Sequence, residues 1–145
     1  MTNSIEDIEK ANCILIVGSN TFEQHPLIAR RVIRAKEKGA KVIVIDPRNT
    51  MTAHQADLYL QLLPGTNTAL LNGIMHHIIK KELHDKEFVK KRTKGFEELK
   101  KVVEKYTPEY VSKICGVSPE LIEKAAELYA SAENASFLYC MGITQ

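Results

Sequence analysis

Residues 13–18 read Cys-Ile-Leu-Ile-Val-Gly, and residues 42–47 read Val-Ile-Val-Ile-Asp-Pro. Each stretch is a short, unbroken apolar run followed by residues that end a strand, which is typical of a strand buried on both faces of a parallel sheet. Between them, Pro26 suits the first position of a helix and Gly39 its C-terminal end, so we expect a helix over residues 26–38. A strand, a helix and a second strand within about 30 residues predict a right-handed βαβ crossover.

The alternation of strands and helices continues toward the C-terminus. Leucines alternate with polar or aromatic residues over residues 57–62, which predicts a third strand, and residues 136–140 predict a further buried strand. Helices are expected over residues 4–12, 68–83, 86–92, 96–106 and 119–131, and a short one beginning at Pro108. This order indicates an α/β fold with a mostly parallel sheet, and we expect residues 1–145 to form a single domain.

Composition describes an ordinary globular chain. It has 145 residues, of which 44% are hydrophobic and 26% charged, and its formal net charge is +2. These values exclude a fibrous or disordered protein and give no electrostatic reason to expect nucleic-acid or membrane binding. The three cysteines lie far apart and lack C-x-x-C spacing, so no disulfide framework, zinc site or iron–sulfur cluster is expected within this chain.

Targeting signals are not apparent in the sequence. No apolar run approaches the ~18–20 residues that span a bilayer, and the first twelve residues do not form a signal peptide, so we expect a cytoplasmic protein. The chain ends at Gln145, shortly after a predicted strand, where a loop or helix normally follows. This ending leads us to expect a piece of a longer protein.

Four predicted strand ends are polar or contain glycine. They are residues 18–21, 46–50, 64–67 and 141–145. Ligands of open parallel α/β sheets bind beyond the carboxyl ends of the strands, where these loops should converge. Together the loops predict a nucleotide-binding site.

The first loop, Gly18-Ser19-Asn20-Thr21, offers backbone and short side-chain donors. Gly18 lets the backbone approach a phosphate closely, and the next three residues carry hydroxyl or amide groups. The alternative interpretation is that Gly18 only ends the strand. The dinucleotide fingerprint G-x-G-x-x-G is absent, which disfavours NAD.

The loops at residues 46–50 and 64–67 carry further candidate contacts. Asp46 closes the second strand, where such folds place an acid against ribose hydroxyls, and Arg48 offers a planar donor group for a phosphate or a base. Gly65-Thr66-Asn67 leads into a helix N-terminus, an end that favours anions. Alternatively, Asp46 only caps the Asp-Pro turn and the Gly65 stretch only begins a capped helix. The agreement of the four loops favours a functional role.

Other candidate chemistry is weaker. His76 and His77 are neighbours in a predicted helix and cannot both face one ligand, so we expect one in the core and the other in solvent. No Ser/His/Asp arrangement or carboxylate pair with an acid–base role is recognisable.

Residues 111–126 resemble a helix-turn-helix, but acidic side chains dominate the second helix and phosphates would repel them, so a DNA-binding protein is a remote alternative.

Several motifs carry a resemblance to a known enzyme family, in that family's order: ILIVGSNTFEQHP, GAKVIVIDPRNT, TAHQAD, LLPGTNTALLNGIMHHII, KGFEELKKVVEKYTPEYVSKICGVSPELIEKAAELYA and YCMGITQ. The set resembles an internal segment of the molybdopterin oxidoreductases, most closely the catalytic (alpha) subunit of formate dehydrogenases. The resemblance implies a Rossmann-like, three-layer α/β domain. It also implies a parent oxidoreductase that converts formate to carbon dioxide at molybdenum or tungsten held by two molybdopterin guanine dinucleotides. The motifs GSN, DPR, PGTN and MGxxQ fit a sibling such as nitrate reductase as well, and the match around KGFEELKKVVEKYTPE favours formate dehydrogenase.

The resemblance further implies that this chain holds one of the two dinucleotides. Near the phosphates, the resemblance places Gly18, Ser19, Asn20, Thr21 and Glu23. At the guanosine end, it places Asp46, Pro47, Arg48, Asn49, Gly65, Thr66 and Asn67. Close to the pterin, it places Met141, Gly142 and Gln145.

The family's catalytic groups fall outside this sequence. Residues 1–145 lack the cysteine cluster for a [4Fe–4S] centre, the catalytic cysteine or selenocysteine with its adjacent histidine, and the later arginine. We therefore expect an excised domain without catalytic or metal-ligating residues, which is inactive alone and retains no cofactor. Its expected partners are the remaining domains of the parent subunit and an electron-transfer subunit, with no nucleic acid and no membrane span.

Overall fold

The computed structural model describes residues 3–145 and divides into two compact units. One unit comprises the chain up to Gln61 together with Ala132–Gln145, and the other comprises Leu62–Ser131. The first contains the whole sheet and the second is helical. The expectation that residues 1–145 act as one domain stays a prediction.

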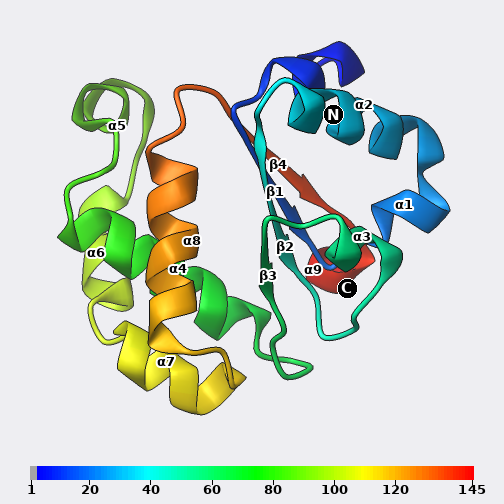
Figure 1. Cartoon of the computed structure of the whole chain (residues 1–145). Helices are drawn as coiled ribbons and strands as arrows, with labels where there is room; N and C mark the ends of the chain where they lie inside the picture. Colours follow the sequence, from blue (N-terminus) through cyan, green and yellow to red (C-terminus); the bar gives the residue numbers. More distant parts are fainter. Residues whose placement is uncertain (1–2) are drawn as a thin grey trace. The chain divides into compact units, whose positions relative to one another are not determined.

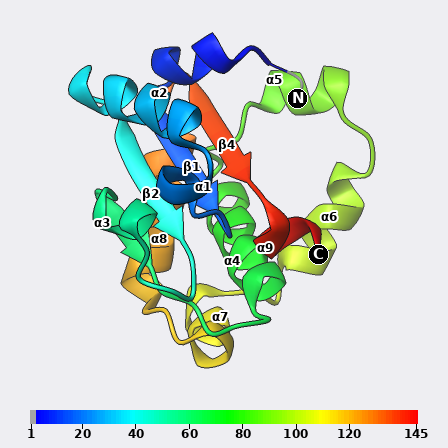
Figure 2. The ribbon, with the colours of Figure 1, turned by 90° about the vertical axis from the view of Figure 1, so that its right-hand side faces the viewer.

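The first unit is built on a four-stranded sheet whose strands all run parallel (Figure 1). The strands lie in the order β3-β2-β1-β4, and β4 pairs with β1 (Figure 2). This confirms the expected α/β fold with a parallel sheet, and the order is that of a Rossmann-like half. The elements are the 3-10 helix η1 (Ile5–Lys10), β1 (Cys13–Val17), α1 (Thr21–Gln24), α2 (Pro26–Glu37), β2 (Lys41–Ile45), α3 (Met51–His54), β3 (Leu58–Leu60), β4 (Ala135–Tyr139) and α9 (Met141–Thr144).

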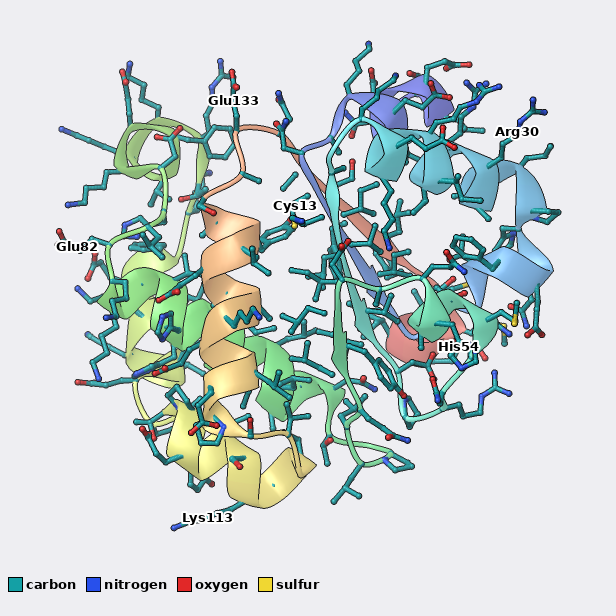
Figure 3. The ribbon with its side chains drawn as sticks, viewed as in Figure 1. Cys13, Arg30, His54, Glu82, Lys113 and Glu133 are labelled. Atoms are coloured by element: carbon teal, nitrogen blue, oxygen red, sulfur yellow. The ribbon has the colours of Figure 1, made fainter. Side chains whose placement is uncertain are left out.

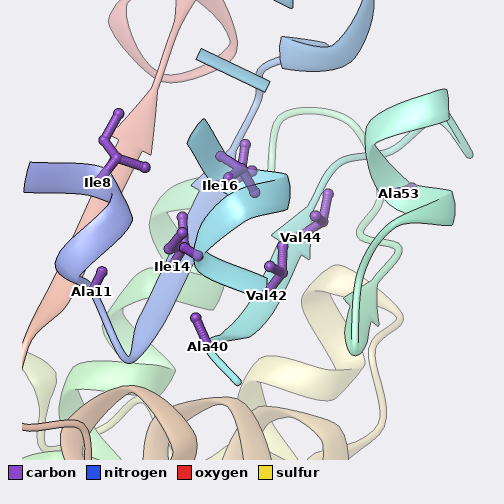
Figure 4. Close-up of a cluster of buried hydrophobic side chains, with 10 residues drawn as sticks. Ile8, Ala11, Ile14, Ile16, Ala40, Val42, Val44 and Ala53 are labelled. Carbon is purple, nitrogen blue, oxygen red and sulfur yellow. The ribbon is translucent and has the colours of Figure 1, made fainter. Parts of the chain in front are cut away.

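One face of this sheet packs into an aliphatic core. Ile14 and Ile16 of β1 and Val42 and Val44 of β2 point to the same side, because side chains two positions apart share a face (Figure 4). Small or branched residues of α2 and α3 complete the cluster, among them Val32, Ala35 and Ala53. All five residues of β1 are buried, including those on the opposite face. Burial on both faces explains why this strand has no polar alternation in its sequence.

The fourth strand differs from its prediction. It lies at the edge of the sheet, and among the described strands it pairs only with β1. Leu138 packs against the core, but Phe137 is 41% exposed and Tyr139 is 55% exposed. The expectation of a fully buried strand is therefore wrong, because an apolar run does not reveal whether its strand is central or at an edge.

The second unit consists of α4 (Asn67–Lys80), α5 (Lys86–Arg92), α6 (Phe96–Val103), α7 (Pro108–Cys115) and α8 (Pro119–Ala130). The predicted starts of the last two helices are confirmed. Pro108 and Pro119 occupy the first turn, and the hydroxyl of Ser118 accepts a hydrogen bond from the Leu121 amide at 3.4 Å. Helix α4 packs against α6, α7 and α8, so it forms the centre of this unit.

Both neighbouring histidines of α4 are buried, so the expectation that one is solvated is wrong. His76 Nδ1 lies 3.0 Å from the carbonyl oxygen of Val103 on α6. His77 faces α8, where Nε2 lies 3.3 Å from Glu127 Oε1 and Nδ1 lies 3.6 Å from Glu123 Oε1. Consecutive residues can both be buried here because α6 and α8 cover adjacent sides of α4. Two acids of α8 thus contact a histidine within the unit, which further disfavours a DNA-reading role for that helix.

Candidate functional site

The carboxyl ends of β1 and β4 lie side by side at the point where the strand order reverses. From β1 the chain crosses through α2 to β2 on one side, whereas β4 pairs with β1 on the other side. In the register, Val17 is opposite both Ile45 and Tyr139, so three strands end at one level. Open α/β sheets bind ligands at such a switch point. The loops at residues 18–21, 46–50 and 141–145 therefore gather at this edge.

Two glycines form the closest backbone approach at this edge. The amide of Gly142 donates to the carbonyl of Gly18 at 3.2 Å, and the amide of Gly18 donates to Ile45 O at 3.0 Å. A Cβ atom at Gly18 would lie 2.7 Å from Gly142 Cα, and one at Gly142 would lie 2.6 Å from Gly18 Cα. Gly18 also has a φ of +57°, which favours glycine. Gly142 is exposed at this edge of the sheet, and Gly18 is partly buried.

The residues after Gly18 form a buried, hydrogen-bonded loop. Ser19 Oγ and Thr21 Oγ1 lie 2.9 Å apart, so these two expected phosphate donors also bond to each other. The hydroxyl of Thr52 donates to Asn20 Oδ1 at 3.1 Å. Glu23 is exposed on α1. The structure thus brings the four loop residues together and leaves Glu23 at the surface.

Asp46 has the structural role that the sequence left open. Its Oδ1 accepts a hydrogen bond from the Arg48 amide at 2.8 Å, so the carboxylate holds the turn around Pro47. The Tyr59 hydroxyl donates to the carbonyl of Asp46 at 2.9 Å. Burial, and then the Asp46 charge, raise the pKa of Tyr59 above its ordinary value. Arg48 and Asn49 are exposed beyond this turn.

The loop Gly65-Thr66-Asn67 belongs to the second unit. Gly65 has a φ of +81° with open space where a Cβ would stand. Thr66 occupies the cap position of α4, but its hydroxyl donates to Leu63 O at 2.6 Å and does not cap the helix. Thr66 therefore does not cap α4 through its side chain, because the preceding turn takes its hydroxyl. That these three residues share a ligand with the first unit stays a prediction.

The last loop follows β4 as the short helix α9. Met141 is exposed at its start, and Gln145 is exposed at its end, where its amide donates to Met141 O at 3.0 Å. Just before it, Cys140 Sγ lies 3.9 Å from Nε2 of His25. The other cysteines are buried. Burial raises the pKa of Cys13 to about 11 and also raises the pKa of Cys115; Cys13 lies at the start of β1 (Figure 3).

The sequence did not indicate a role for Thr52 or Tyr59, although both side chains hold loops of the candidate site in place. Thr52 lies on α3, whose four residues are too few to show a helical period. Tyr59 was assigned only to strand alternation, although a hydroxyl within a buried strand is a signal for a hydrogen-bonded role.

Within residues 3–145, no set of three or more histidine, cysteine, aspartate or glutamate residues is placed to hold a metal ion. None of the described helices has the length and apolar character needed to cross a bilayer.

Comparison with known proteins places this geometry in a family. The family model described as molybdopterin oxidoreductase matches residues 1–145. Over all 145 residues, the chain is 72% identical to the F420-dependent formate dehydrogenase 1 subunit alpha of Methanococcus maripaludis. It is 68% identical to the F420-dependent formate dehydrogenase subunit alpha of Methanocaldococcus jannaschii, again over 145 residues. In both cases it spans 22% of the relative, about a fifth of its length.

More distant relatives share the same segment. Over 97% of this chain and 20% of the relative, identity to a nitrate reductase of Synechocystis is 39%. Among solved structures, acetylene hydratase from Pelobacter acetylenicus superimposes with a TM-score of 0.85 at 38% identity, covering 91% of this chain and 18% of that one. The match over the whole sequence and the fold agree: this chain belongs to the molybdopterin oxidoreductase family.

Proposed function

We propose that this chain is the cofactor-holding part of a formate dehydrogenase catalytic subunit. The observation that carries the proposal is the 72% identity to a formate dehydrogenase alpha subunit along the whole chain, against 39% for a nitrate reductase. The parent oxidoreductase converts formate to carbon dioxide. A sibling with another substrate, such as nitrate, is the alternative, because groups outside residues 1–145 select the substrate.

The residues at the sheet edge fit a dinucleotide. The Gly18–Gly142 contact brings two backbone segments together at the sheet edge, and Arg48, exposed in the loop after β2, adds a planar cation. We assign the cofactor as molybdopterin guanine dinucleotide, whose molybdenum or tungsten, when bound, supplies the two-electron oxidation of formate. The residues proposed to hold it are Gly18, Ser19, Asn20, Thr21, Glu23, Asp46, Pro47, Arg48, Asn49, Gly65, Thr66, Asn67, Met141, Gly142 and Gln145.

The remainder of the parent completes the proposed enzyme. It supplies the catalytic cysteine or selenocysteine, the [4Fe–4S] cluster and contacts to an electron-transfer subunit, in the cytoplasm. The role proposed for residues 1–145, acting as one α/β domain, is to bind and orient one dinucleotide.

Formate activity tests the substrate assignment. The full-length parent, purified with its cofactor, is expected to reduce a viologen dye with formate and to show no nitrate reduction. Residues 1–145 alone should show neither reaction, because the catalytic groups lie elsewhere. Nitrate reduction without formate oxidation by the parent would establish the sibling alternative.

Guanine preference tests the cofactor assignment on this chain itself. Titration with GDP is expected to shift the amide resonances of Gly18, Asp46 and Gly65 more than titration with ADP. Gly39, at the other end of the β1–β2 crossover, is the internal control and should not move. Equal responses to GDP and ADP would contradict the guanine assignment, and a missing response at Gly65 would remove the third loop from the site.

A further inference from the structure

A buried hydroxyl from α3 connects two segments of the candidate site. Thr52 is 0% exposed, and its Oγ1 lies 3.1 Å from the Phe22 amide nitrogen and 3.1 Å from Asn20 Oδ1. Asn20 is 7% exposed and stands between Ser19 and Thr21 at the end of β1. Thus α3, which follows β2, holds the loop that follows β1.

The donors and acceptors fix which way the Asn20 amide faces. The Phe22 amide can only donate, so Thr52 Oγ1 is its acceptor. The single hydroxyl hydrogen of Thr52 is then left to donate, and Asn20 Oδ1 accepts it. With the amide reversed, Nδ2 would face the hydroxyl oxygen as a second donor, and the buried hydroxyl hydrogen would lose this acceptor. The arrangement therefore commits Oδ1 to Thr52 and directs Nδ2 away from it.

In the part of the chain that the structure describes, the Asn20 Nδ2 group is a donor without a hydrogen-bond partner. Across residues 3–145, the structure gives it no hydrogen-bond acceptor, although the residue is more than nine-tenths buried. The neighbouring hydroxyls of Ser19 and Thr21 bond to each other. An unpaired amide donor on a largely buried side chain, at the carboxyl end of a parallel strand, matches an anionic oxygen of a ligand.

We propose that Thr52 is a positioning residue that turns the Asn20 amide so that Nδ2 donates to a phosphate oxygen of the dinucleotide. This inference rests on the proposed cofactor-holding function and adds to it a residue outside the proposed contact set. Thr52 acts through Asn20 and does not itself contact the ligand.

Three single variants of this chain and one double variant test the inference, with GDP as the probe. Thr52→Val keeps the shape and removes the hydroxyl, and is expected to weaken GDP binding about tenfold. Thr52→Ser keeps the hydroxyl and should bind within about twofold of wild type. Asn20→Asp keeps the acceptor but replaces the donor with a negative charge, and should abolish binding. Adding Thr52→Val to Asn20→Asp should then change nothing further.

The side-chain amide resonances of Asn20 give the decisive readout. In wild type and Thr52→Ser they should shift as GDP is added, and in Thr52→Val this shift should be lost. Thr93→Val is the matched control, since that hydroxyl donates to Val89 O on α5, in the other unit, and its loss should leave binding unchanged.

The outcomes separate this inference from the proposed function. If Thr52→Val melts at a lower temperature yet binds GDP like wild type, the positioning role is overturned and the cofactor assignment stands. If wild-type backbone amides respond to GDP but the Asn20 side chain does not, the positioning role is likewise overturned, even when Thr52→Val fails to fold. If wild type does not respond to GDP at all, both the cofactor assignment and this inference fail.

Discussion

Replacing Gly18 by alanine will lower the free energy of unfolding of the first unit by about 3 kcal/mol. Two effects add at this position. The φ of +57° places an alanine in the left-handed region, which costs about 1 kcal/mol. The new Cβ would also lie 2.7 Å from Gly142 Cα and 2.9 Å from Gly142 C, backbone atoms that cannot rotate away, which adds about 2 kcal/mol. Chemical denaturation followed by circular dichroism measures the total.

Two other glycines separate these effects. Gly39 has a φ of +99° and nothing within 4 Å of an added Cβ, so Gly39→Ala should show only backbone strain, about 1–2 kcal/mol. Gly142 is not among the glycines with positive φ in the described chain, so Gly142→Ala should show only the steric overlap, about 2 kcal/mol. The double variant Gly18→Ala/Gly142→Ala should cost less than the sum of the single variants, because the first Cβ already forces the two backbones apart. Equal losses for Gly18→Ala and Gly39→Ala would contradict the close approach of these loops.

The central strands and the first crossover could be predicted because their signals are local. The runs at residues 13–17 and 42–45 have no polar residue, and Pro26 and Gly39 mark the ends of the helix between them. The structure places β1, α2 and β2 within one residue of these bounds. A strand buried on both faces has an unbroken apolar run in its sequence, so these two strands can be predicted from the sequence alone.

The edges of the fold could not be predicted, because they depend on topology. Phe137 and Tyr139 belong to an apolar run like that of β1, but the strand that carries them has one described neighbour. The four-residue helices α1 and α3 are shorter than the window in which a helical period can be recognised. His77 is buried because α8 covers it, which no pattern within α4 indicates.

In the candidate site, too, the residues with a local sequence signal could be predicted, and the contacts between distant segments could not. Gly18 was predicted from its position after a buried strand, and the structure adds that Gly142 sets the steric limit there. Asp46 was correctly placed at a strand end, yet its bond to the Arg48 amide emerges only from the folded turn. Thr52 lies 32 residues from Asn20 in the sequence, so its role depends on how two loops meet. Contacts between distant loops leave no periodic signal in a single sequence.

Replacing Ile16 by alanine will lower the free energy of unfolding of the first unit by about 3–4 kcal/mol. Ile16 is 0% exposed in an interior strand and belongs to the core cluster with Val32 and Val44, so the substitution leaves a cavity that neighbouring strands prevent from closing. Ile16→Val removes one methylene from the same place and should cost about 1 kcal/mol. Ile33 on α2 is 41% exposed, and Ile33→Ala is the matched control, with an expected loss below about 1 kcal/mol.

Denaturant unfolding of the three variants tests the packing of β1, and GDP titration then tests whether that packing serves the site. Ile16 lies two residues before Gly18, on the strand whose end presents the first loop. If β1 acts as a rigid support, Ile16→Val should leave GDP affinity unchanged despite its lost stability, because the strand ladder with β2 and β4 still fixes the position of Gly18. A fall in affinity for Ile16→Val that matches or exceeds its loss of stability would contradict this, and would mean that core packing itself sets the loop geometry. A loss for Ile16→Ala no larger than that for Ile33→Ala would contradict the central place of β1 in the core.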